Sequence, residues 1–183
     1  MSGDDLARPD AEAGAASAMG GATPGAEVQV VEFGLGQEVF AVPVALVREI
    51  LDYRPPCHVP NGPHHFLGLT DVRGQGVPTV DLRLRLCMAQ AEPTLATRIL
   101  ILDVPLEQRL LTLGVVIDRV LDVSSYERAR IEAAPDIGVR WNCNYITGVV
   151  RREDGFVVMV DVGRIFTAED VAAVPPPLRR AAG

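Results

Sequence analysis

Two apolar runs around a glycine-rich turn, in residues 68–86, constrain the fold of this chain more than any other feature. Between the runs, Gly74 and Gly76 allow the positive φ angles that a tight reversal requires. The second run is rich in β-branched residues and ends at Asp81, which is a favourable N-cap for a short helix. The stretch therefore predicts a β-hairpin followed by a short helical segment, with the charged side chain of Arg73 projecting from the hairpin turn.

Similar short runs, separated by Gly and Pro, occur along most of the chain. Pro43 is well placed to begin a helix, so we expect a helix over residues 44–51. We expect a second helix over residues 164–174. Alternating apolar and polar residues predict strands at residues 28–33, 38–42, 68–72, 77–80, 98–104, 109–116, 117–123, 145–151 and 156–162. Many short strands with few helices predict an all-β barrel or sandwich.

Composition narrows the class of protein. The chain has 183 residues, of which 48% are hydrophobic, enough to build a core for one domain or two small ones. It contains no apolar run near the roughly 20 residues that span a bilayer, and residues 1–26 lack the apolar block of a secretory signal. The net charge of −7 disfavours a sequence-independent nucleic-acid binder. We therefore expect a cytoplasmic protein with no nucleic-acid partner and no direct membrane insertion.

All 17 basic residues counted as Lys or Arg are arginines. The absence of lysine excludes a Walker-type phosphate loop, Schiff-base chemistry and the strand lysine of a protein kinase. The three cysteines are far apart and form no C-x-x-C motif, which is typical of free thiols in a reducing compartment; they are Cys57, Cys87 and Cys143.

One cluster could bind a metal. Cys57, His58, His64 and His65 include all the histidines of the chain, and imidazole and thiolate are good ligands for zinc or copper. A polar loop that happens to contain them is the simpler interpretation, because neighbouring side chains of an extended segment point in opposite directions. No nucleophile elbow or dinucleotide fingerprint occurs in the sequence. The prediction is a protein that is not an enzyme and holds neither metal nor cofactor, with a metal-binding protein as an alternative.

The chain resembles the chemotaxis coupling protein (CheW) family in five segments that follow one another in the family's order. The hairpin segment V-R-G-x-G-V-P-T-V-D-L-R is the most specific. The other four, each weak alone, lie at residues 39–50, 59–63, 113–118 and 145–148. The resemblance covers about residues 27–171, between an N-terminal tail (residues 1–26) and a flexible C-terminal tail (residues 172–183).

The resemblance implies two small five-stranded SH3-like barrels, with short helices, packed together over a shared apolar seam. We place the barrels at about residues 27–92 and 93–171. Residues 68–82 and 148–162 support such a duplication, since both contain an apolar strand after Gly, a turn, and a V-D-apolar ending.

The resemblance also implies a non-catalytic adaptor. One surface would bind the cytoplasmic tip of a methyl-accepting chemoreceptor in a groove between the barrels, at Val47, Glu49, Gly68, Arg73, Gly114, Val120, Val123 and Gly148. Another would bind the regulatory domain of the histidine kinase CheA, with which the adaptor can alternate in rings, at Thr97, Arg98, Ile99, Ile131, Glu132 and Ile137. Without the resemblance, the three valines indicate core, the glycines indicate turns or close packing, and the charged residues are solvated.

The sequence departs from the family pattern at four positions. Leu67 and Asp71 replace a common basic residue and a common Asn near the hairpin, which leaves the fold intact but affects receptor choice. Glu132 and Ile137 replace residues that are often basic and aromatic, which puts the usual ring contacts in doubt. A CheW-like scaffold in a receptor–kinase pathway other than chemotaxis is the alternative function.

Overall fold

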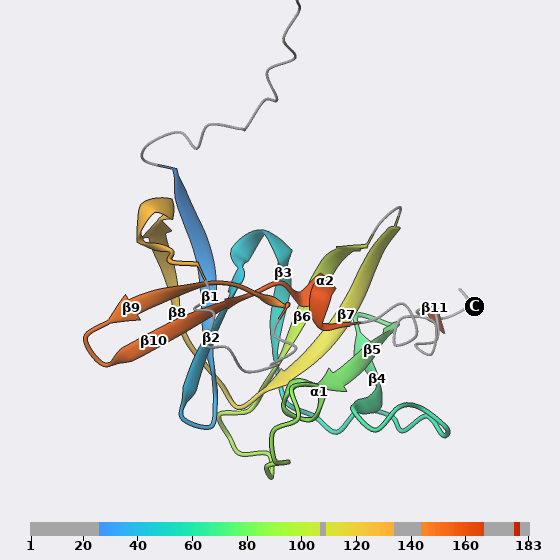
Figure 1. The fold of residues 1–183 in the computed structure, drawn as a ribbon. Helices are drawn as coiled ribbons and strands as arrows, with labels where there is room; N and C mark the ends of the chain where they lie inside the picture. Colours follow the sequence, from blue (N-terminus) through green and yellow to red (C-terminus); the bar gives the residue numbers. More distant parts are fainter. Residues whose placement is uncertain (1–25, 107–108, 134–143, 167–177, 180–183) are drawn as a thin grey trace, which may run out of the picture.

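Short β-strands dominate the computed structural model, which describes residues 26–106, 109–133, 144–166 and 178–179 (Figure 1). The strands are β1 (Glu27–Leu35), β2 (Glu38–Pro43), β3 (Val47–Asp52), β4 (Phe66–Val72), β5 (Gln75–Asp81), β6 (Arg98–Leu106), β7 (Arg109–Ile117), β8 (Arg119–Glu127), β9 (Ile146–Arg152), β10 (Gly155–Val160) and β11 (Leu178–Arg179). The helices are short: α1 (Leu82–Arg85), α2 (Val162–Ile165) and the 3-10 segments η1 (Val44–Leu46) and η2 (Arg128–Arg130). None of the described helices is long and apolar enough to cross a membrane.

The strands form two sheets. The first barrel has the order β8-β1-β2-β10-β9, and the second has the order β3-β6-β7-β5, with β4 also paired to β5. The short β11 pairs with Gln75 and Gly76 of β5, before the part of β5 that pairs with β7. In each barrel one pair of strands is parallel, β2 with β10 and β5 with β7. This arrangement confirms the predicted all-β fold of two five-stranded barrels with short helices.

Each barrel takes strands from both halves of the sequence (Figure 1). The first repeat, residues 27–86, runs from β1 to α1, and the second, residues 98–166, runs from β6 to α2; each has five strands followed by a short α-helix. However, β1 and β2 pair with β8 and β10 of the second repeat, while β6 and β7 pair with β3 and β5 of the first. The predicted division into barrels over residues 27–92 and 93–171 is therefore wrong, because the open hairpin edges of one repeat pair with strands of the other.

The two repeats agree in their local irregularities. The β4–β5 ladder skips Leu67 before Gly68, and the β9–β10 ladder skips Thr147 before Gly148. Asp81 and Asp161 each cap the helix that follows, through side-chain oxygens that accept backbone N–H bonds. The predicted duplication and the predicted cap at residue 81 are confirmed.

The largest apolar cluster lies between the barrels rather than inside either one. Alternate residues of a strand point to opposite faces, so each inner strand serves the shared seam with one face and its own barrel interior with the other. The seam cluster includes Val31, Phe33, Phe40, Val42, Leu100, Leu102, Leu113 and Val115. Smaller clusters fill the interiors, around Val30, Ala41, Tyr126 and Val150 in the first barrel and around Val77, Ile99, Ile101 and Val116 in the second.

The helix predicted over residues 44–51 is wrong. Only η1 is helical there, and the chain then enters β3, whose residues pair antiparallel with β6. The exposure of β3 alternates along its length, as expected of an edge strand. Apolar positions at helical spacing misled the prediction, because the β-branched residues of this segment fit a pleated surface and the pairing with a distant strand decides the outcome.

The ends of the chain also differ from expectation. The C-terminal tail was predicted to have no regular structure, yet β11 pairs with Gln75 and Gly76 of β5. The free edge of β5 beyond its pairing with β7 provides the unpaired backbone groups for this contact. The predicted helix over residues 164–174 begins earlier, as α2, and its part beyond Phe166 lies outside the described residues, as does most of the N-terminal tail.

Candidate functional site

The turn between β4 and β5 presents Arg73 at the surface. Arg73 and Gly74 have φ angles of 53° and 83°, so both central residues of this turn are left-handed. Asp71 holds the turn, because its Oδ1 accepts a hydrogen bond of 2.7 Å from the Gly74 amide. The Arg73 side chain is 84% exposed, so the turn displays a guanidinium group on a fixed support.

Glu49 and Arg73, both predicted receptor contacts, meet in the structure. Arg73 Nη2 lies 3.3 Å from Glu49 Oε2, although Glu49 is on β3 and Arg73 is in the turn between β4 and β5. Glu49 is 22% exposed and Arg73 almost fully so, and an ion pair of this kind contributes at most about 1 kcal/mol to stability. The guanidinium group of Arg73 therefore remains accessible to a partner protein.

The three predicted valines lie along the edge strands. Val47 at the start of β3 and Val120 near the start of β8 are half-buried, and both pack against the seam cluster. Val123, further along β8, is 61% exposed. The core interpretation is therefore partly right for the first two and wrong for Val123.

The three predicted glycines are buried, and at each position the neighbouring atoms leave no room for a Cβ. A Cβ on Gly68, whose φ is +133°, would collide with the carbonyl oxygen of Cys57. A Cβ on Gly114 would lie 2.6 Å from Thr79 Oγ1, and one on Gly148 would overlap the Ile131 side chain. These glycines allow close approach within each barrel, and Gly148 lies beside a predicted kinase contact rather than beside Arg73.

The predicted kinase contacts are divided between surface and core. Ile99 is completely buried and Thr97 is 5% exposed, so neither side chain can reach a partner in this conformation. Arg98 is partly exposed and lies 3.4 Å from Asp52, and Glu132 is exposed beside β9, with which its backbone pairs. Ile131 is half-buried, and Ile137 lies outside the described residues.

The structure does not support the metal-binding alternative. Within the described part of the chain, no group of three or more His, Cys, Asp or Glu side chains could hold a metal ion. Cys57 is exposed and its backbone pairs with Leu69, while the ring of His65 lies 6.3 Å from that of Phe166. Cys57 and His65 thus contact different neighbouring residues and do not form one binding site.

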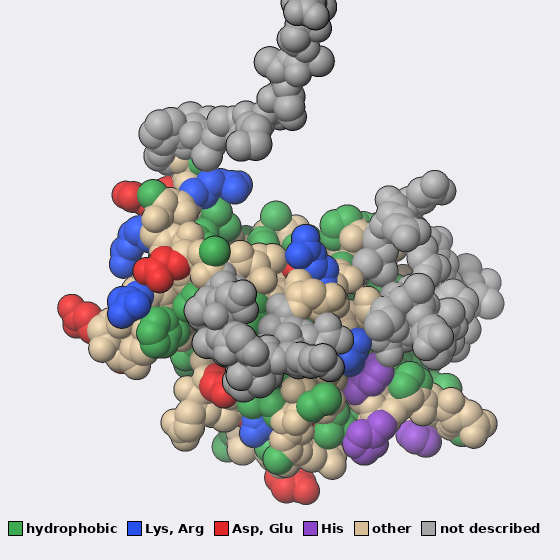
Figure 2. All heavy atoms as spheres, in the orientation of Figure 1, with side chains coloured by type: hydrophobic (Ala, Val, Ile, Leu, Met, Phe, Trp, Pro, Cys, Tyr) green, Lys and Arg blue, Asp and Glu red, His purple; other side chains and the backbone are tan. Residues whose placement is uncertain are grey.

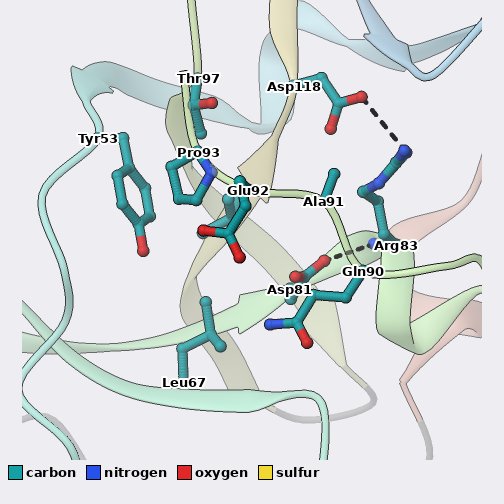
Figure 3. A pocket seen from close by; sticks show the side chains of 11 residues that line it. Tyr53, Leu67, Asp81, Arg83, Gln90, Ala91, Glu92, Pro93, Thr97 and Asp118 are labelled. Carbon is teal, nitrogen blue, oxygen red and sulfur yellow. Dashed lines mark hydrogen bonds and ion pairs between the residues drawn. The ribbon is translucent and has the colours of Figure 1, made fainter. Parts of the chain in front are cut away.

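A small cavity opens beside the second barrel (Figure 3). Its volume is about 100 Å³, below the several hundred Å³ typical of small-molecule sites. Its ionisable groups belong to Tyr53, Asp81, Arg83, Glu92 and Asp118 (Figure 3). Burial raises the pKa of Tyr53, and the carboxylates of Asp81 and Glu92 raise it further. Arg83 bonds to Asp118 at 3.3 Å, so the charged groups stabilise one another.

On the face shown in Figure 2, acidic and basic side chains are interspersed and no single basic patch dominates. The mixture is clearest around the β9–β10 hairpin, which contains Arg151, Arg152, Glu153 and Asp154. A protein that binds nucleic acid through its phosphates needs a concentration of positive charge. This face offers apolar and mixed-charge surface instead.

Sequence reasoning missed two polar contacts. Glu32 lies in the strand predicted over residues 28–33, yet its side chain is fully buried and bonds to Tyr126 and Arg152. Asp118 accepts a 2.6 Å hydrogen bond from the Gly36 amide and so ties the β1–β2 turn to the second barrel. Alternation alone gives no signal for either, because both contacts join residues distant in sequence.

The sequence of this chain is similar to those of known chemotaxis proteins. The CheW-like domain matches residues 29–170. The chemotaxis protein CheW of Klebsiella aerogenes is 30% identical over 158 residues, covering 86% of this chain and 92% of that protein. The chemotaxis protein CheW of Rhizobium meliloti is 29% identical over 142 residues, covering 78% and 89%.

The fold has a counterpart among solved structures. The crystal structure of the scaffolding protein TtCheW from Thermoanaerobacter tengcongensis superposes with a TM-score of 0.69 at 19% identity. The match covers 79% of this chain and 96% of that one. With its paired barrels and with a family match that spans most of its length, the chain belongs to the CheW-like domain family.

Proposed function

We propose that this protein is a non-catalytic adaptor that couples methyl-accepting chemoreceptors to the histidine kinase CheA in chemotaxis. The family match supports this function, and the juxtaposition of Glu49 with Arg73 is the structural observation that carries it. The proposed surface combines this charged pair, which joins β3 to the β4–β5 turn, with the exposed apolar side chain of Val123 on the other edge strand. Such a surface suits a helical partner, for which apolar anchors provide affinity and a few charges set orientation.

The proposed receptor surface consists of Val47, Glu49, Arg73, Val120 and Val123. Each of these side chains lies on an edge strand or at a hairpin turn. Gly68, Gly114 and Gly148 support this surface indirectly, since they allow the strands to pack closely. A receptor tip would bind by contacts to the five side chains.

The proposed kinase contacts lie elsewhere among the described residues, at Arg98, Ile131 and Glu132; Ile137, also proposed, is outside the described residues. Arg98 and Glu132 belong to different barrels, so they offer two separated contacts for kinase regulatory domains. An adaptor with two such contacts can alternate with its partner in a ring when the rotation between them permits closure. Through these partners the protein would be held at membrane-bound receptor arrays.

Titration calorimetry with two partners tests the function. We expect micromolar binding both to a soluble receptor signalling fragment and to the kinase regulatory domain, each from the same genome. Glu49→Arg should weaken receptor binding about tenfold or more, because it places a cation beside Arg73, and should leave kinase binding unchanged.

Glu27→Arg is the matched control, because Glu27 is an exposed acid at the other end of the β1–β8 ladder from Val120. It should bind both partners like the unmodified protein. No binding of either partner by the unmodified protein would contradict the adaptor function. Binding of the kinase domain but not of the receptor fragment would indicate a scaffold that binds a different class of receptor.

A further inference from the structure

The sheet of each barrel has two end strands that no ladder joins among the described residues. They are β8 and β9 in the first barrel and β3 and β4 in the second. In the described part of the chain, one backbone bridge spans each gap, between Glu132 and Val149 in the first barrel and between Cys57 and Leu69 in the second. Each bridge has two hydrogen bonds of 2.7–2.9 Å. Because so few backbone bonds resist separation of the end strands, side chains must help to close each barrel.

The second barrel has a charged contact across its gap, at the surface. Glu49 is on β3, and Arg73 lies in the turn that follows β4. Arg73 Nη2 and Glu49 Oε2 lie 3.3 Å apart. This ion pair connects the two end strands of the second barrel.

The equivalent positions in the first barrel cannot form such a pair. The end strands β3 and β8 each have one bulge in their ladder, and the residue after the bulge is Glu49 in β3 and Asp122 in β8. Arg73 and Glu153 each begin the two-residue turn of their hairpin. The first barrel therefore has two acids where the second has an acid and a base, and two acidic side chains do not attract each other.

A buried contact spans the gap of the first barrel instead. Glu32, on β1, is fully buried. One of its carboxylate oxygens accepts a hydrogen bond of 2.5 Å from Tyr126 Oη on β8, and the other accepts one of 2.7 Å from Arg152 Nη1 on β9. Hydrogen bonds to a charged group are short and strong. Glu32 therefore connects the two end strands from inside the barrel.

A shallow surface pocket opens over the same gap. One wall comes from the segment after β8 and the other from β9 and its turn, and the lining residues are Arg130, Glu132, Arg151, Arg152 and Glu153. Arg152 belongs both to this pocket and to the buried contact, because its side chain is 42% exposed. The distance between the two walls, and thus the position of Glu132, depends on the bond between Arg152 and Glu32.

We infer that Glu32 is a positioning residue, which closes the first barrel and fixes the position of Glu132. The second part of this inference, that the position of Glu132 matters for kinase binding, rests on the proposed function. Glu32 cannot touch the kinase, because its side chain is buried. It acts through Tyr126 and Arg152, which keep β8 and β9 at the separation that the kinase regulatory domain binds.

Native-state hydrogen exchange of the full chain tests the closure of the barrel without any partner. The reporters are the amides of Glu132 and Val149, which form the bridge across the gap. Glu32→Gln keeps the size of the side chain but removes its charge, and we expect both amides to exchange about tenfold faster. Tyr126→Phe removes one of the two bonds and should accelerate them about threefold. Ile101→Val is the control, because Ile101 occupies the position of Glu32 in the second barrel and should leave both amides unchanged.

A charged contact at the surface should compensate for the loss of the buried one. Glu153→Arg copies the Glu49–Arg73 pair of the second barrel, because it places a guanidinium where it can reach Asp122. Added to Glu32→Gln, it should return the exchange of the two bridge amides to within about threefold of the unmodified protein.

Titration calorimetry with the kinase regulatory domain tests the second part of the inference. Glu32→Gln changes no exposed side chain, so a change in affinity arises from the position of the surface residues. We expect Glu32→Gln to weaken kinase binding about fivefold and to leave binding of the receptor fragment within about twofold. Ile101→Val should bind both partners like the unmodified protein.

The outcomes separate this inference from the proposed function. Exchange of the bridge amides that stays within about twofold in both Glu32→Gln and Tyr126→Phe would overturn the inference. So would faster exchange that extends equally to the amides of the β6–β7 ladder, because that pattern indicates general destabilisation. Unchanged kinase affinity in Glu32→Gln, with binding by the unmodified protein, would overturn the role of Glu32 in kinase binding. Failure of the unmodified protein to bind the kinase domain would instead overturn the proposed function, whatever the exchange rates are.

Discussion

Glu32 and Arg152 form an ion pair of 2.7 Å inside the first barrel, with the glutamate side chain fully buried. Tyr126 donates a hydrogen bond of 2.5 Å to the other carboxylate oxygen. The equivalent positions in the second barrel are Ile101 and Val72, which lie in its apolar interior cluster. One barrel therefore has a buried charge where the other has hydrocarbon.

Removal of either partner should destabilise the protein. Arg152→Val leaves a buried carboxylate without its cation, and we expect a loss of about 2–3 kcal/mol, moderated because Arg152 is 42% exposed. The double change Glu32→Ile with Arg152→Val copies the second barrel and should recover most of that loss. Urea unfolding measures both, with the exposed Arg130→Val as control. A double variant no more stable than Arg152→Val would show that the barrel interior cannot accept the apolar pair.

Stability should fall at alkaline pH partly through Tyr126. Burial raises the pKa of Tyr126 above its ordinary value, and the hydrogen bond and the charge of Glu32 raise it further. Because the folded pKa exceeds the unfolded one, this contribution is complete below about pH 10 and declines as the pH rises toward the folded pKa. Urea unfolding between about pH 8 and 11 should show a steeper decline for the unmodified protein than for Tyr126→Phe. Equal slopes would mean that Tyr126 titrates normally.

Gly68→Ala and Gly74→Ala should differ in cost, although both glycines have positive φ. A Cβ on Gly74 meets nothing within 4 Å, so only backbone strain applies, about 1 kcal/mol. A Cβ on Gly68 also collides with the Cys57 carbonyl oxygen, and we expect about 3 kcal/mol or more. Thermal and urea unfolding measure the difference. Similar losses would show that the Cys57 segment moves aside easily.

The two capping aspartates should contribute unequally to the stability of the protein. Asp81 accepts amide bonds from Arg83 and Leu84, whereas Asp161 accepts one from Gly163. Asp81→Ala should therefore cost about 1–2 kcal/mol and Asp161→Ala about half as much. Asn at either position keeps an acceptor and serves as the control. A larger loss at Asp161 would contradict the assignment of these costs to the caps.

Arg73→Gly should separate stability from function. Arg73 has a φ of 53°, so glycine relieves backbone strain and should raise the free energy of unfolding by about 0.5–1 kcal/mol. The same change removes the exposed guanidinium, and receptor control of kinase phosphorylation should be lost in a reconstituted mixture. Cys87→Gly is the matched control, because Cys87 is exposed with a φ of 59° and should gain stability without loss of coupling. If the Arg73 variant keeps full receptor control of the kinase, Arg73 has no role beyond its place in the turn.

Local signals in the sequence were sufficient for the hairpins and the caps. Gly74 and Asp81 impose a turn and a helix start by their own chemistry, so the β4–β5 unit could be predicted with its helix. The segment at residues 44–51 could not, because its pairing with β6 depends on residues some fifty positions away. The exchange of strands between repeats and the burial of Glu32 are likewise decided by long-range pairing. The Glu49–Arg73 pair was predicted only as two separate contacts of one groove.

The exchange of strands also determines when the protein can fold during its synthesis. The hairpin formed by β1 and β2 leaves the ribosome early, but its partners β8 and β10 lie about a hundred residues later. Until those residues emerge, one apolar face of the hairpin has no covering strand, and the second barrel has formed without its neighbour. Pairing over such separations slows folding and prolongs the exposure of strand edges. A stalled or truncated chain would therefore be prone to aggregate, because neither of its barrels is encoded by the N-terminal half alone.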